Sequence, residues 1–173
     1  MKNKSYGRFR EDRGFKDIED LPRGPSGKPL CRFCKKEVTE EKSAFCGPEC
    51  IHQFKIQSSQ GYMRKTVFER DRGVCNKCGL DTEKLKQILF RVKEEKGDLA
   101  YESLLQKYET HYGYSFSLDK HFWEADHITP VAHGGGSCGL DNLQSLCVPC
   151  HKKKTMAQLT KSWKRHYWRK KSN

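Results

Sequence analysis

The chain has 173 residues, of which 35% are hydrophobic and 32% charged, and its formal net charge is +12. This length suits one modest domain or two very small ones, and the low apolar content excludes a large hydrophobic core as the sole source of stability. No apolar run approaches the roughly 18 residues of a membrane span, and the N-terminus lacks the apolar segment of a signal peptide, so we expect no membrane contact and an intracellular protein, nuclear if its source is eukaryotic.

The first expected region is the N-terminal segment 1–28. It is polar, mixes both charge signs and ends in the Pro- and Gly-rich sequence LPRGPSGKP. Such a composition resists regular structure. We therefore predict that residues 1–28 are disordered.

Nine cysteines dominate the candidate ligands. Eight of them form four closely spaced pairs, with Cys138 left over: Cys31 and Cys34, Cys46 and Cys50, Cys75 and Cys78, and Cys147 and Cys150. Eight thiols in such pairs make two tetrahedral four-cysteine Zn²⁺ sites. Disulfides are the rival interpretation, but they need an oxidising compartment, which the missing signal peptide argues against. We predict two structural zinc ions.

A small zinc module is expected over residues 29–61. Cys31-x-x-Cys34 should form a tight knuckle, and Gly47-Pro48 should begin a helix whose first turn carries Cys50. That helix is predicted to end near Gly61. Because four thiolates leave zinc no open position, the role of this module is predicted to be structural.

Residues 62–160 are expected to form a second domain that contains a helical insertion. A helix is predicted over 62–72, and the second zinc site begins at Cys75. Apolar residues then recur at helical spacing on both sides of Gly97-Asp98, in the two sets Leu85, Ile88, Leu89, Val92 and Tyr101, Leu104, Leu105, Tyr108. This pattern predicts two amphipathic helices over about 82–110, with their stripes in the core. Because 68 residues separate Cys78 from Cys147, the helical hairpin is an insertion within one zinc site.

The stretch FWEADHITPVAHGGGSCGLDNLQSLCVPCHKKK carries the candidate catalytic residues. Asp126 and His151 can supply a carboxylate oxygen and an imidazole nitrogen to a divalent ion while leaving positions for water and phosphate. Imidazole titrates near neutral pH, so His127 can serve as a general base. In a regular strand the side chains of Asp126 and His127 point to opposite faces, so a twist or bulge is needed to bring both to one phosphate.

The order Asp-His, Asn about fifteen residues later, and Cys-x-x-Cys-His at a helix start resembles the HNH endonuclease motif with its ββα-metal core. The chain is most similar to the C-terminal HNH domain of the zinc-finger Ran-binding-domain annealing helicase and endonuclease family, through HFWEADHITPV, GGGSCGLDNLQSLC and CHKKKT. The resemblance covers roughly residues 28–157. It implies a small α+β fold, DNA as substrate, including branched or fork-like DNA of repair or replication, and products with a 3′-hydroxyl and a 5′-phosphate.

Carried over by position, the resemblance assigns a role to each site residue. His127 is similar to the general base, and Asn142 to the residue that orients the loop by hydrogen bonding. Asp126 and His151 are similar to the ligands of a catalytic Mg²⁺ or Mn²⁺. The structural zinc set is implied to be Cys75, Cys78, Cys147 and Cys150, which leaves Cys31, Cys34, Cys46 and Cys50 for the other zinc.

The C-terminal part of the chain is strongly basic. Residues 151–173 hold nine Lys and Arg and no acid, and 161–173 form a basic tail with interleaved aromatic residues. Such a tail suits phosphate contact and base stacking. The candidate nucleic-acid contacts are Lys152, Lys153, Lys154, Lys164, Arg165, Trp168 and Arg169. The tail has no clear sliding-clamp motif, and a non-catalytic zinc-stabilised DNA-binding module is the alternative function.

Overall fold

The computed structural model describes residues 17–39, 43–136 and 138–171, with side chains up to residue 160. The chain divides into two compact units, Met1–Met63 with Ser137–Leu140, and Arg64–Gly136 with Asp141–Asn173. Within the described ranges, no helix is both long enough and apolar enough to cross a membrane. The disorder predicted for residues 1–16 lies outside the described residues.

Residues 17–28 are more ordered than their composition predicted. They contain a short 3-10 helix, Ile18–Asp20, and the side chain of Leu21 is buried. The backbone N–H and the hydroxyl of Ser26 both donate to the carboxylate of Glu37, at 2.7 and 2.5 Å. The prediction of disorder was therefore wrong for this part of the segment, because a partner eleven residues away supplies the hydrogen bonds that the local sequence lacks.

Two helices follow the first cysteines, as predicted. Helix α1 spans Pro48–Ser58 with a proline in its first turn, and helix α2 spans Gln60–Asp71. The break between them is at Ser59, whose backbone is extended. Gly61, expected near the end of the first helix, lies instead in the first turn of α2.

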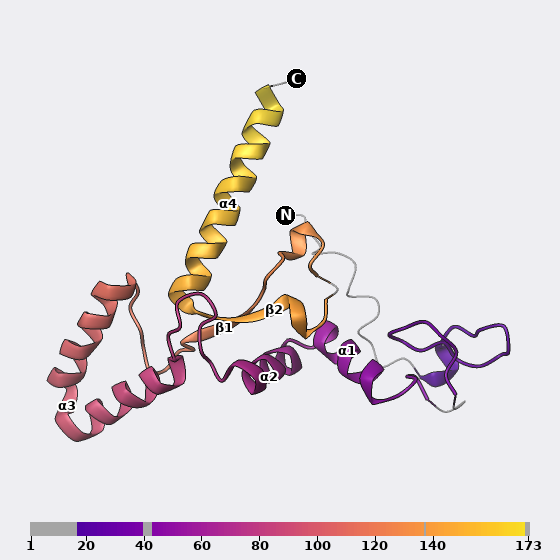
Figure 1. The fold of residues 1–173 in the computed structure, drawn as a ribbon, viewed down its shortest axis with the longest axis horizontal. Coiled ribbons are helices and arrows are strands. Elements are labelled where there is room, and N and C mark those ends of the chain that lie inside the picture. Colours follow the sequence, from indigo (N-terminus) through magenta and orange to yellow (C-terminus); the bar gives the residue numbers. More distant parts are fainter. Residues whose placement is uncertain (1–16, 40–42, 137, 172–173) are drawn as a thin grey trace. The chain divides into compact units, whose positions relative to one another are not determined.

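The predicted helical insertion is helix α3, Thr82–Tyr112, which bends sharply in the middle (Figure 1). It begins at Asp81, whose side chain accepts a hydrogen bond from the backbone N–H of Lys84, an N-cap arrangement. Gly97 leaves helical geometry with φ 79° and ψ 177°, so two helical arms meet there. Glycine adopts such a positive φ without steric cost, which explains why the predicted turn falls at this residue.

The two arms of α3 face one hydrophobic core. Its buried members are Leu85, Leu89, Phe116 and Phe122. The second arm adds partly buried side chains at the predicted spacing: Tyr101, Leu104, Leu105 and Tyr108. The expectation that the stripes belong to the core is confirmed for Leu85 and Leu89 of the first arm and for all four residues of the second.

The remaining elements form a β-hairpin followed by a helix. Strands β1, Trp123–His127, and β2, Leu143–Cys147, pair antiparallel. Helix α4, Val148–Lys171, begins directly where β2 ends and packs against both strands (Figure 1). This ββα arrangement confirms the small α+β fold expected from the sequence.

The outer edge of β2 is covered by the chain around the end of α2. Asp71 Oδ2 accepts a hydrogen bond from the Ser145 backbone N–H at 3.0 Å, and Arg70 Nη2 donates to the Leu143 carbonyl at 2.8 Å. The backbone N–H of Asn76 donates to the Ser145 carbonyl at 2.8 Å. Unpaired edge groups of a two-stranded sheet otherwise remain open to water or to other strands. These contacts complete the hairpin on its exposed side.

We expect Asp71→Asn to destabilise the protein in a pH-dependent way. The hydrogen bond from Arg70 is the largest cause that lowers the pKa of Asp71, so the stability that its carboxylate contributes is present above pH ~4 and is lost as the pH falls through the lowered pKa. The variant should lose about 1–3 kcal/mol at pH 7, because Arg70 and Ser145 lose a charged acceptor.

Urea unfolding of the two proteins between pH 8 and pH 3 tests this expectation, with Asp98→Asn as a matched control at an exposed carboxylate. The difference in free energy of unfolding between wild type and Asp71→Asn should become smaller below pH ~4. Asp98→Asn should have the wild-type free energy of unfolding at each pH. A difference that is constant down to pH 3 would contradict the role given to the Asp71 charge.

Candidate functional site

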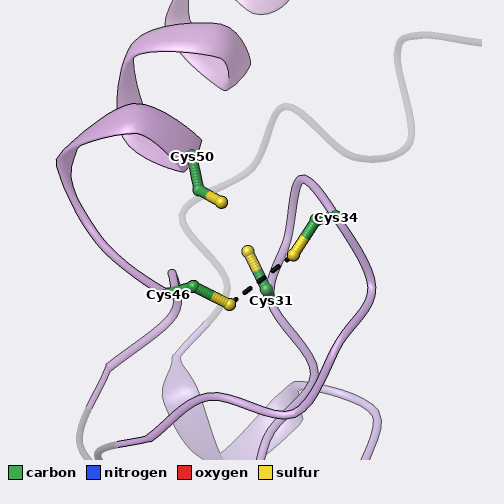
Figure 2. Close-up of side chains that lie close together, drawn as sticks. All are labelled: Cys31, Cys34, Cys46 and Cys50. Carbon is green, nitrogen blue, oxygen red and sulfur yellow. Dashed lines mark hydrogen bonds between the residues drawn. The ribbon is translucent and has the colours of Figure 1, made fainter.

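The first cysteine cluster lies in the N-terminal unit. The Sγ atoms of Cys31, Cys34, Cys46 and Cys50 all lie within 4.8 Å of one another. Figure 2 shows the four side chains converging, with Cys50 on the first turn of α1 and the other three on loops. The Sγ atoms of Cys34 and Cys46 are 3.5 Å apart. Zn–S bonds of about 2.3 Å in a tetrahedron place sulfurs roughly 3.8 Å apart, so the cluster fits a zinc ion.

The second cluster joins segments that are far apart in sequence. The Sγ atoms of Cys75, Cys78, Cys147 and Cys150 lie within 4.8 Å of one another, and those of Cys78 and Cys147 are 3.7 Å apart. Cys147 ends β2 and Cys150 lies in the first turn of α4, so a zinc ion here ties the knuckle before α3 to the strand–helix junction. The sequence prediction of two four-cysteine clusters is confirmed.

The thiols of each cluster do not ionise alike. Burial raises the pKa of Cys31, but hydrogen bonds from the backbone of Cys34 and Cys46 outweigh it and lower the value to about 6. The pKa of Cys46 is raised to about 12, chiefly by the neighbouring Cys34 thiol. The pKa of Cys75 is likewise lowered to about 7 and that of Cys150 raised to about 11. Each cluster thus combines a thiol whose pKa is lowered with thiols whose pKa is raised, and a dication that replaces the remaining protons suits both clusters.

Asp126 and His151 are brought together from β1 and α4. Asp126 Oδ1 and His151 Nε2 are 3.9 Å apart, and their side chains are 17% and 35% exposed. This separation is too long for a hydrogen bond but shorter than twice the ~2.1 Å of a Mg²⁺–ligand bond, so one ion can contact both atoms. A carboxylate oxygen and an imidazole nitrogen leave most positions of a six-coordinate ion for water and phosphate. The pair therefore fits a catalytic divalent metal.

Asn142 holds the Gly-rich loop against the end of β1. Its Oδ1 accepts from the Thr129 backbone N–H at 2.8 Å, and its Nδ2 donates to the carbonyls of Thr129 and Gly135 at 3.2 and 3.1 Å. A Cβ at Gly135 would lie 1.9 Å from the Thr129 carbonyl oxygen, so glycine is required there. Asn142 thus fixes the chain directly after His127.

His127 is the last residue of β1 and lies opposite Leu143 in the register of the hairpin. It is half-buried. The neighbouring Glu124 is engaged elsewhere, because its carboxylate accepts from Arg64 Nη1 at 2.8 Å. His127 therefore adjoins Asp126 along β1, and Glu124 has a structural partner in α2.

An open groove of about 800 Å³ is lined in part by Gln144 and Lys154, whose side chains donate hydrogen bonds to Asp126. It lies between α4, β2 and the chain that follows β1, and its lining includes Gln144, His133 and the lysines Lys77, Lys153 and Lys154. Lysines beside a metal pair provide the positive charge that a phosphate backbone requires.

The seven candidate nucleic-acid contacts differ in their surroundings. Lys152 Nζ lies 4.5 Å from the centre of the Tyr114 ring, Lys153 is exposed, and Lys154 is hydrogen-bonded to β1. Four further candidates lie on α4 beyond the described side chains: Lys164, Arg165, Trp168 and Arg169.

Two residues that contact Asp126 were not assigned this role from the sequence. Gln144 Nε2 donates to Asp126 Oδ2 at 3.1 Å, and Lys154 Nζ donates to the same oxygen at 2.5 Å. Gln144 is the cross-strand partner of Asp126, and Lys154 follows His151 by three residues on one helix face. The i, i+3 spacing from His151 could have indicated from the sequence that Lys154 lies near Asp126. The contact of Gln144 could not be predicted without the register of the hairpin.

Comparison with known proteins identifies relatives of this chain. Residues 113–156 match the profile of the family described as HNH endonuclease. The chain is 35% identical over 145 residues to the human DNA annealing helicase and endonuclease ZRANB3, and 37% identical to the mouse protein, covering 76% of this chain in both cases. It spans only 13% and 14% of the length of those relatives. The crystal structure of the human ZRANB3 HNH domain is 32% identical, covers 64% of this chain and 98% of that chain, and gives a TM-score of 0.41.

Proposed function

Because this chain belongs to the HNH endonuclease family, we propose that it is a divalent-metal-dependent DNA endonuclease that hydrolyses phosphodiester bonds. The observation that carries the proposal is the approach of Asp126 Oδ1 to His151 Nε2, at 3.9 Å, within the region that matches the family. The surrounding chain adds a groove with lysines for the substrate.

In the proposed mechanism each residue has a separate task. Asp126 and His151 hold the Mg²⁺ or Mn²⁺ ion, which when bound would neutralise charge on the phosphate and on the leaving 3′-oxygen. The His127 imidazole accepts a proton from the attacking water, and Asn142 keeps the backbone after His127 in place. The products are a 3′-hydroxyl and a 5′-phosphate. The two zinc ions hold the framework and take no part in the reaction.

A nicking assay with purified protein tests the proposed activity and identifies the DNA structure that is cut. End-labelled plain duplex, flap and fork substrates are incubated with Mg²⁺, Mn²⁺ or Ca²⁺, and product ends are identified by ligation. We expect cleavage with Mg²⁺ or Mn²⁺ on at least one substrate, with ligatable ends. Salt-dependent DNA binding without cleavage under any of these conditions would favour the non-catalytic DNA-binding module instead.

A further inference from the structure

Lys154 differs from the two lysines before it in where its ammonium group lies. Its Nζ donates to Asp126 Oδ2 and to the carbonyl oxygen of His127, and it lies 3.3 Å from the carbonyl oxygen of Ile128. The side chain is only 20% exposed. A lysine ammonium has three N–H donors, so these three oxygens occupy all of them. Lys154 therefore has no donor left for a phosphate unless it gives up one of these contacts.

The contacts of Lys154 also show how the backbone runs at the end of β1. Successive carbonyls of a regular strand point in opposite directions. One ammonium reaches the carbonyls of both His127 and Ile128, so the chain bends at this step. The bend follows His127, whereas Asp126 and His127 keep their regular places opposite Gln144 and Leu143 within β1.

The same ammonium restricts the Asp126 carboxylate. Oδ2 accepts from Lys154 and from Gln144, which leaves Oδ1 toward His151. Hydrogen bonds to the far oxygen fix the plane of a ligating carboxylate and thus the direction of its free oxygen. Lys154 accordingly acts at once on the proposed metal ligand and on the backbone of the proposed base.

We propose that Lys154 is a positioning residue, which directs the free oxygen of the Asp126 carboxylate toward His151 and holds the backbone carbonyl of the His127 base. This inference rests on the proposed nuclease function. It assigns Lys154 a task different from the DNA contact that its position in a basic run indicates.

The test compares Lys154→Met with Lys153→Met, which removes the same charge from an exposed neighbour lining the same groove. Three quantities are measured in each variant: kcat and KM for nicking, the salt dependence of DNA binding, and amide hydrogen exchange over residues 126–129. For Lys154→Met we expect kcat to fall at least tenfold with KM and salt slope unchanged, and exchange to accelerate. Lys153→Met should keep wild-type exchange over residues 126–129 and lose up to about 0.9 from its salt slope as a phosphate contact. Lys154→Arg, which retains charge and donors, should recover part of kcat.

Two outcomes would overturn the inference. A loss of salt slope in Lys154→Met with normal exchange and kcat would make Lys154 a phosphate contact. Faster exchange with unchanged kcat would make it a structural brace alone. If the wild-type protein cuts none of the substrates, the proposed nuclease function fails, while exchange and salt slope still decide whether Lys154 braces β1 or contacts DNA.

Discussion

Replacing Cys147 with serine is expected to unfold the second unit, because it removes one of four ligands from the cluster that joins β2, α4 and the knuckle before α3. Structural zinc contributes roughly 10–16 kcal/mol of apparent binding free energy at pH 7, which is comparable with the entire stability of ~5–15 kcal/mol of a typical domain. The variant should lose the cooperative thermal transition of this unit, and its zinc content should fall from two ions per chain to one.

Cys138→Ser is the matched control for this prediction. It makes the same chemical change at a cysteine that belongs to neither cluster. Circular dichroism melts and metal analysis should give wild-type values for this control. A Cys147→Ser protein that binds two zinc ions and melts normally would show that the cluster is not what holds the unit together.

Replacing His127 with alanine is expected to abolish cleavage while the fold and both zinc ions remain. A positioned general base contributes about 10²–10⁴-fold to a rate, so nicking should fall by that factor under saturating DNA. The melting temperature and zinc content should match those of the wild type, since His127 is only half-buried and belongs to neither cysteine cluster.

His121→Ala serves as the control, because His121 is exposed and lies before β1, outside the proposed site. It should cut at the wild-type rate in the same assay. Residual cleavage by His127→Ala equal to that of His121→Ala would require a different base. Comparison of His127→Ala and His121→Ala with Cys147→Ser distinguishes a loss of catalysis from a loss of folding.

The elements that could be predicted from the sequence are those set by local signals. Cysteine spacing predicted two four-cysteine clusters, Pro48 marked a helix start, and Gly97 marked the bend in α3. The helix start and the bend are set within a few residues of the chain, whereas the joining of Cys75 and Cys78 to Cys147 and Cys150 was implied by the family resemblance.

The features that could not be predicted depend on pairings between distant segments. Gln144 reaches Asp126 only because the hairpin has one particular register, which the geometry of the intervening Gly-rich loop decides. The ordered conformation of residues 17–28 likewise depends on a hydrogen bond to Glu37, which lies outside that segment. The position of Asp71 against Ser145 joins residues 74 apart in the chain.

The bend at Gly97 has a consequence for how this protein can change in evolution or by design. The insertion that contains it begins and ends near the second cysteine cluster, so the entropy of closing that segment grows only slowly with its length, by about 0.6 kcal/mol for each doubling. Leu99, next to the bend, is 85% exposed and carries no core contact that a longer tip would disrupt. The tip of α3 is therefore a site where additional residues, or a whole grafted domain, can be accommodated without altering Asp126, His127 or His151.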